Sequence, residues 1–278
     1  GTGPPVIFIH GGYGGVNSTL VPSSNFWIPD LSDNFTIITY DRRSSGKSTY
    51  PNSTYTFNDI VNDLDALIEV LAIDKPFLIG SSAGGPIAMQ YAITKPNKLS
   101  GLILPNTSAR LWNHPDRIHS RELLLERMQH LDEYGESLTY ELIERQQAGP
   151  NPLTLSSKGP GPQTSQIKTQ NLARARLITE QLQTLPTESH KLFVLGELRN
   201  QGAFLSIDLT DNLKQIDLPT LILHGDSDTQ VPFTLGQELS YAIPDSSFVT
   251  IHGAGHGLMS WPTTISHINS FLLAQSNL

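Results

Sequence analysis

The chain has 278 residues, of which 38% are apolar, and its formal net charge is −8 at pH 7. This length suits one α/β domain with an insertion, and the acidic balance argues against nucleic acid or an anionic membrane as the main partner. The absence of cysteine excludes disulfides, thiol nucleophiles and cysteine-bound metals, and no apolar run reaches the ~20 residues of a membrane span.

Short apolar runs alternate with helical patterns along most of the chain. The runs predict strands at 6–9, 35–39, 76–79, 100–104, 220–223 and 247–251. Helices are expected at 56–72, 85–95, 233–242 and 262–274. All-apolar strands alternating with helices are typical of a parallel sheet that helices cover on both faces.

The pattern changes between residues 110 and 208, where β-branched runs are few. Helix-like stretches occur there at about 118–133, 136–147, 170–184 and 187–199. Residues 151–163 are rich in Pro, Gly and Ser and are expected to form a loop. The sequence therefore predicts an all-helical insertion at 110–208 that divides an α/β core into residues 1–109 and 209–278.

The segment Gly80-Ser81-Ser82-Ala83-Gly84 fits the pattern G-x-S-x-G and lies between a predicted strand and a predicted helix. A turn this sharp places one side chain in strained backbone space, exposed above the sheet edge. Ser82 is that residue, because the frame with Ser81 would need a glycine where Ile79 stands. Ser82 is the predicted nucleophile.

A serine hydroxyl needs a base, and acids and histidines follow two later strands. Asp226 and Asp228 come after the run 220–223, and His252 and His256 come after the run 247–251. His256 lies in a glycine-rich loop and is the predicted base, whereas His252 at the strand end is expected to be structural or solvent-facing. The order Ser, acid, His is expected for one fold class, and differs from the order in trypsin-like and subtilisin-like enzymes.

Glycines also follow the first predicted strand, in the segment 10–15, where a backbone N–H could stabilise an oxyanion. Together with the serine, acid and histidine segments, this turn makes the chain resemble the α/β-hydrolase superfamily. The segments 40–48, 218–220 and Val231-Pro232 are similar to the family's pattern as well. The resemblance implies an α/β-hydrolase fold with a helical cap inserted after the family's sixth strand, above the catalytic turn.

The resemblance also assigns roles to individual residues. It selects Asp228 over Asp226 as the acid that orients His256, and it implies that the amides of Gly12 and Ala83 form the oxyanion hole. Tyr13 is the less favoured second donor. Some relatives carry the acid after the sixth strand, but the corresponding segment 104–107 has no carboxylate.

Side chains that could line a substrate pocket are Tyr13, Trp112, Phe204, Met259 and Trp261. Of the last four, at least two are expected to be plain core residues. Asp41, Arg42 and Arg43 are expected to fix the turn beside the pocket. Since nucleotide-binding glycine patterns and metal-binding spacings are lacking, no cofactor or metal is expected.

These observations predict a serine hydrolase that cleaves a small ester, lactone or related acyl substrate through an acyl-enzyme on Ser82. Alternatives are an aminopeptidase similar to proline iminopeptidases, a carbon–carbon bond hydrolase, and a ligand-binding receptor that retains the triad. Family members have two further strands before the glycine turn, so a removed segment or a short variant is expected here. No signal peptide is recognisable, which favours a cytoplasmic location, and secretion and oligomeric state stay open.

Overall fold

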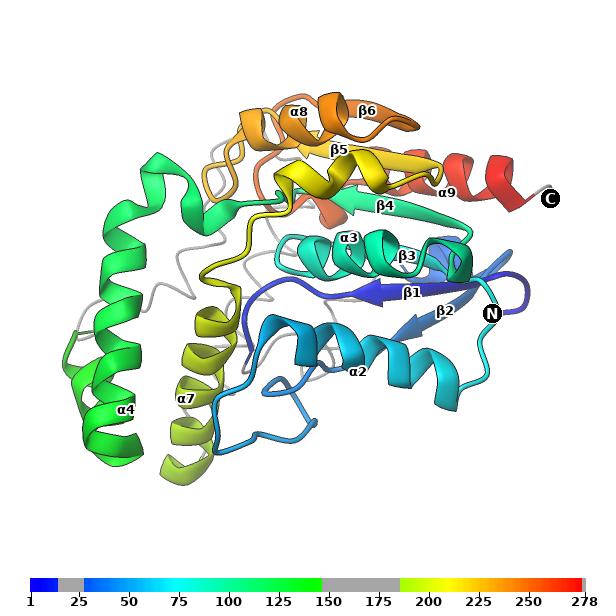
Figure 1. The fold of residues 1–278 in the computed structure, drawn as a ribbon. Coiled ribbons are helices and arrows are strands. Elements are labelled where there is room, and N and C mark those ends of the chain that lie inside the picture. The colour runs from blue at the N-terminus through cyan, green and yellow to red at the C-terminus, as the bar shows by residue number, and fades with distance from the viewer. Residues whose placement is uncertain (15–27, 147–185, 277–278) are drawn as a thin grey trace.

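The computed structural model describes residues 1–14, 28–146 and 186–276 (Figure 1). Its centre is a parallel sheet with the strand order β2-β1-β3-β4-β5-β6. The strands are β1 (Pro5–Ile9), β2 (Thr36–Thr39), β3 (Phe77–Gly80), β4 (Gly101–Pro105), β5 (Thr220–Gly225) and β6 (Ser246–Ile251). Because all strands run in one direction, their carboxyl ends meet at one edge of the sheet.

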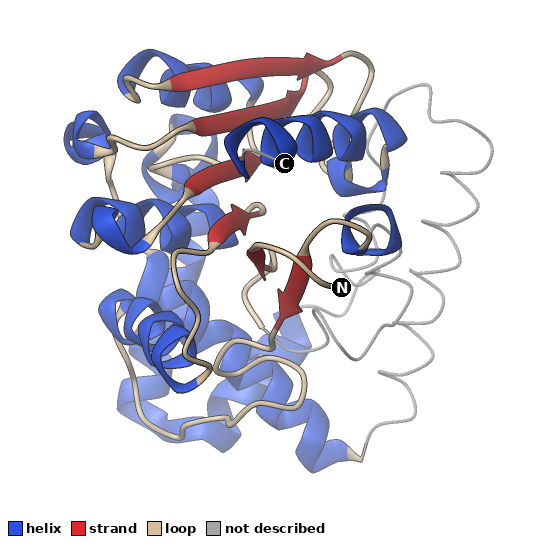
Figure 2. Ribbon diagram, turned by 90° about the vertical axis from the view of Figure 1, so that its right-hand side faces the viewer, coloured by secondary structure: helices blue, strands red, loops and turns tan. Residues whose placement is uncertain are grey.

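Both faces of the sheet are apolar, and successive side chains of a strand point to opposite faces. In β1, Ile7 and Ile9 pack into one hydrophobic cluster and Val6 and Phe8 into the other. Figure 2 shows helices on both sides of the strands. This arrangement explains why the inner strands β1, β3 and β4 are almost entirely apolar and buried.

Helices from different parts of the chain cover the two faces. One face is covered by α2 (Phe57–Val70), α3 (Gly84–Thr94) and α8 (Phe233–Ala242). The other is covered by α1 (Ile28–Ser32) and α9 (Pro262–Ser276). Short 3₁₀ turns lie at Pro96–Lys98, Leu111–Asn113, Pro115–Arg117, Thr210–Gln215 and Leu258–Ser260.

The segment between β4 and β5 is helical where it is described. It contains α4 (Ile118–Gln146) and α7 (Thr187–Phe204), which pack through the apolar side chains Leu124, Leu131, Ile143, Leu195 and Leu198. Gly135 has a φ of 77° and interrupts α4, at the break that the sequence predicts between 133 and 136. In Figure 1 both helices stand beyond the carboxyl ends of the strands.

The predicted fold class is confirmed: a parallel sheet between helices, with further helices inserted after β4. That strand corresponds to the sixth of the family, whose numbering includes two earlier strands. The predicted helix 170–184 and loop 151–163 lie outside the described residues. The division into a core and a cap with the boundaries 110 and 208 stays a prediction. No described helix has the length and apolar character needed to cross a bilayer.

Candidate active site

Ser82 occupies a tight turn between β3 and α3. Its φ of 51° is in the left-handed region, which costs a residue with a side chain about 1–3 kcal/mol. The surroundings impose this conformation, because the Ser82 amide donates to the Pro105 carbonyl at 3.1 Å. The Ser82 carbonyl accepts from the Gly85 amide at 2.9 Å and from the Thr107 hydroxyl at 2.6 Å.

The glycines of the motif allow this turn to approach the neighbouring strand. A Cβ at Gly84 would lie 2.2 Å from the carbonyl oxygen of Ile9, and a Cβ at Gly80 would lie 2.8 Å from the Cβ of Ala88. Neither space admits a side chain. The G-x-S-x-G pattern therefore reflects packing of the turn against β1 and α3 as well as backbone conformation.

Three residues that are distant in sequence form one hydrogen-bonded chain. His256 Nε2 lies 2.9 Å from Ser82 Oγ, and His256 Nδ1 lies 2.8 Å from Asp228 Oδ2. Since an ionised carboxylate only accepts, Nδ1 carries the proton, and Nε2 is left to accept from the serine hydroxyl. The Asp228 side chain is fully buried and the His256 side chain is 17% exposed.

The loop after β5 holds Asp228 as an anion. Burial alone would raise the pKa of this carboxyl group, but the hydrogen bond from His256 and those from the amides of Val231 and Gln230 lower it below its ordinary value. These amides donate to Asp228 Oδ1 at 3.0 and 2.8 Å. One oxygen is thus anchored by the backbone while the other faces the imidazole.

The rival acid and histidine form a separate pair. His252 Nδ1 lies 2.9 Å from Asp226 Oδ2, and the amide of Gly253 donates to Asp226 Oδ1 at 2.7 Å. The His252 side chain is 86% exposed, as the sequence predicts for a solvent-facing residue. Asp226 therefore stabilises a surface turn and makes no hydrogen bond with His256.

Asn106, directly after β4, is a contributor that the sequence reasoning missed. Its side-chain amide donates to the carbonyls of Gly255 and His256, and its own φ is 50°. The next residue, Thr107, donates to Ser82 as described above. The segment after β4 therefore connects the serine turn with the histidine loop.

The glycine turn after β1 lies against Ser82. A Cβ at Gly11 would approach the Ser82 Cβ to 2.9 Å. The buried guanidinium of Arg42 donates to the carbonyl of Gly12 and holds this turn in place, in agreement with the structural role predicted for Arg42. Among the described residues, the amides of Gly12 and Ala83 have no hydrogen-bond acceptor.

His10 supports the same turn as a neutral imidazole. The ring is buried, with Nδ1 2.8 Å from the Gly11 carbonyl, and the Arg42 amide donates to Nε2 at 3.3 Å. One nitrogen must therefore donate while the other accepts. Burial and the nearby Arg42 charge lower the pKa of His10 to about 3.

This buried histidine predicts a loss of stability in mild acid. Below pH 6.5 the unfolded chain binds a proton at His10 that the folded chain rejects until about pH 3, so the folded state loses ~1.4 kcal/mol per pH unit. Between pH 6.5 and 5 we expect the free energy of unfolding to fall by ~2 kcal/mol more in the wild type than in His10→Gln. Urea denaturation at both pH values measures this difference. The exposed His252→Gln is the control, and equal pH dependence in the wild type and His10→Gln would contradict the assignment.

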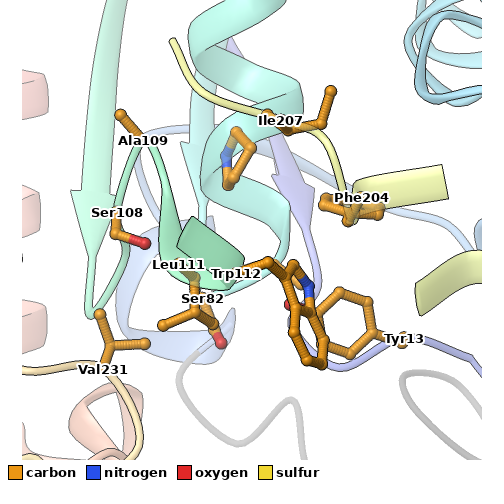
Figure 3. Close-up of a pocket in the computed structure, with 11 residues that line it drawn as sticks. Tyr13, Ser82, Ser108, Ala109, Leu111, Trp112, Phe204, Ile207 and Val231 are labelled. Carbon is orange, nitrogen blue, oxygen red and sulfur yellow. The ribbon is translucent and has the colours of Figure 1, made fainter. Parts of the chain in front are cut away.

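A pocket opens beside Ser82 and is mostly apolar (Figure 3). Its lining includes Tyr13, Trp112 and Phe204, three of the five predicted substrate contacts. Met259 and Trp261 are not among the lining residues and pack instead against the hydrophobic cluster under α9. The full lining is Tyr13, Ser82, Ala83, Pro86, Ser108, Ala109, Leu111, Trp112, Phe204, Ile207 and Val231.

Aromatic rings form one wall of the pocket. The ring of Tyr13 meets Phe204 edge-on at 5.3 Å between centroids and lies 5.7 Å from Trp112. Burial raises the pKa of Tyr13 to about 12, so this wall is uncharged at neutral pH. In the described part of the chain, no group of three or more His, Asp or Glu side chains is arranged to hold a metal ion.

Comparison with known sequences places this arrangement in a family. Residues 4–262 match the family described as the alpha/beta hydrolase fold. The chain is an α/β hydrolase.

Several other α/β hydrolases are similar to this one at modest identity. The putative carbamate hydrolase RutD of Caulobacter segnis is 24% identical over 260 residues, covering 92% of this chain and 85% of that protein. A probable proline iminopeptidase of Leptolyngbya boryana is 28% identical over 277 residues, covering 92% and 82%. The solved structure of a thermophilic esterase from Thermogutta terrifontis, with malate bound, has a TM-score of 0.71 and is 25% identical, covering 99% of this chain and 92% of that one.

Proposed function

We propose that this hydrolase cleaves small esters, lactones or related acyl compounds with Ser82 as nucleophile, His256 as base and Asp228 as the acid that orients the base. The observation that carries the proposal is the hydrogen-bonded chain from Ser82 Oγ through both nitrogens of His256 to the buried Asp228 carboxylate. A neutral imidazole with its proton on Nδ1 is ready to accept the serine proton.

The reaction then follows from the positions of these groups. Ser82 Oγ attacks the substrate carbonyl while its proton passes to His256 Nε2, and the amides of Gly12 and Ala83 donate to the oxyanion. Each such donor contributes ~2.7–4 kcal/mol of transition-state stabilisation. His256 next protonates the leaving group, and it then removes a proton from the water that hydrolyses the acyl-enzyme. Asp228 stabilises the imidazolium that forms twice in this cycle.

The pocket supports a small, mostly apolar substrate. It is narrow, with a volume of about 20 Å³, and its lining is mostly apolar and contains no charged side chain. Four of its lining residues belong to the segment 110–208: Leu111, Trp112, Phe204 and Ile207. The helical insertion would therefore select the substrate, while the core supplies the reacting groups.

An aminopeptidase is the second candidate, and the similarity to a proline iminopeptidase favours it. Recognition of a free amino terminus requires a carboxylate or several carbonyl groups facing the amine. The described pocket lining contains no Asp or Glu. The ester or lactone is therefore the preferred substrate class.

Two measurements on the purified protein test this function. A fluorophosphonate should label Ser82, and a panel of methyl esters, lactones and proline p-nitroanilide should show turnover of the first two classes. Turnover of the anilide alone would favour the aminopeptidase. Labelling without any turnover would favour a receptor that retains the triad.

Asn106 is expected to position the base. In Asn106→Ala the loop of His256 loses two hydrogen bonds, so we expect kcat to fall ~10–100-fold while KM changes little, because the imidazole shifts relative to Ser82. Steady-state kinetics on a methyl ester measure the split. Asn200→Ala is the matched control, since Asn200 is equally buried, also leaves its Oδ1 without a partner, and donates to Arg43 instead. The same loss of kcat in both variants would mean that general destabilisation is responsible.

A further inference from the structure

Ser108 is a buried hydroxyl in the wall of the acyl pocket that the proposed reaction does not use. The residue is 2% exposed and lines the pocket with mostly apolar neighbours. Among the described residues, its hydroxyl makes no hydrogen bond. Ser108 is not among the residues whose side-chain oxygen is both enclosed by protein and unpartnered, so its hydroxyl reaches the open space of the pocket and is available to a group that binds there.

The position of Ser108 relative to the nucleophile is fixed by its own segment. Pro105 accepts from the Ser82 amide, and Thr107 donates to the Ser82 carbonyl, so the chain on both sides of Asn106 is attached to the serine turn. A Cβ at Gly85 would lie 2.0 Å from the Thr107 hydroxyl oxygen, which shows how closely this segment packs on the start of α3. Ser108 therefore remains beside the site where the acyl group would bind. Figure 3 shows its side chain on the same side of the pocket as Val231.

We infer that Ser108 forms a polar subsite for the acyl group, and that the substrate is a small oxo- or hydroxy-substituted acyl compound. This inference rests on the proposed function. A hydroxyl both donates and accepts, so it can bind a ketone, a hydroxyl group or an ether oxygen of the acyl chain. A charged substituent would meet apolar and aromatic walls and is disfavoured, because no charged side chain is part of the described lining.

The first test compares matched esters by kcat/KM. Methyl 3-hydroxybutanoate is paired with methyl butanoate, and methyl 4-oxopentanoate with methyl pentanoate. In the wild type we expect the substituted ester of at least one pair to be preferred roughly 2–10-fold, which is the range of one neutral hydrogen bond. Ser108→Ala should abolish the preference, because it lowers kcat/KM for the substituted ester more than for the unsubstituted one. Ser45→Ala is the control, since the Ser45 hydroxyl makes no hydrogen bond in the described structure and does not line the pocket.

A second test separates the subsite from the chemistry. In the Ser82→Ala background no acyl transfer occurs, and titration calorimetry measures how the same esters bind. A preference for the substituted esters that Ser108→Ala removes would support the subsite, even if the reaction class proposed above proved wrong. Identical preferences with and without the Ser108 hydroxyl, in binding and in kinetics, would overturn the inference. Failure of Ser82 to react with a fluorophosphonate would count against the proposed function alone.

Discussion

Ser82→Ala should lower kcat by ~10⁴–10⁶ and abolish labelling by a fluorophosphonate, because the variant has no oxygen to attack the substrate carbonyl. The remaining rate would come from the oxyanion hole and from binding. KM should change little, since the pocket walls are untouched. Steady-state kinetics with an ester substrate, followed by mass spectrometry of the labelled peptide, measure both effects.

Ser81→Ala is the matched control, one residue away in the same turn. The Ser81 amide donates to the Ile9 carbonyl, and its carbonyl accepts from Gly84, so the backbone groups of Ser81 maintain the turn without its hydroxyl. The variant should keep most of the activity. Adducts that map to Ser81, or full activity in Ser82→Ala, would show that the nucleophile is misassigned.

Most of the fold was predictable because strands and helices leave their patterns of apolar residues within short stretches of sequence. Each described strand contains an apolar run and differs from its predicted range by two residues or fewer at either end. The five-residue α1 was missed because it is too short for a helical period and contains Pro29. The predicted break between 133 and 136 falls at Gly135, where α4 is interrupted.

The residues brought together at the site were predictable for a different reason. The turn around Ser82 and the loops of Asp228 and His256 each follow a strand, and parallel strands end at the same edge. Asn106 follows a strand too, but its partners are backbone carbonyls about 150 positions away, and no local pattern reports such a contact. The segment in which some relatives carry the acid holds Asn106 here, and its side-chain amide connects the two loops.

The aromatic residues show where sequence proximity misleads. Trp261 and Met259 are close to His256 in the chain, yet the turn Leu258–Ser260 carries them toward α9 and the opposite face of the sheet. Trp112 and Phe204 are far from the triad in sequence, and they reach the pocket only because the insertion folds back over the carboxyl ends of the strands. Pocket walls therefore depend on tertiary packing that a single sequence does not reveal.

Asp228→Asn is the second substitution with a large expected effect. An amide at this position can donate to His256 Nδ1, which favours the imidazole tautomer with its proton on Nε2 and leaves no acceptor for the Ser82 hydroxyl. By analogy with other Ser-His-Asp enzymes, kcat should fall ~10⁴-fold. The fold should persist, because an asparagine oxygen can still accept from the amides of Val231 and Gln230.

Asp226→Asn tests whether the effect belongs to the buried acid or to the loop as a whole. Asp226 lies two residues earlier and pairs with the exposed His252, so its loss should leave kcat within a few-fold of the wild type. Kinetics and thermal unfolding of both variants give the comparison. Because only Asp228 faces the imidazole, a large loss of kcat confined to Asp228→Asn is expected at unchanged unfolding temperature. Equal losses in both variants would mean that these carboxylates act by holding the loop, and the charge opposite His256 would then have no special role.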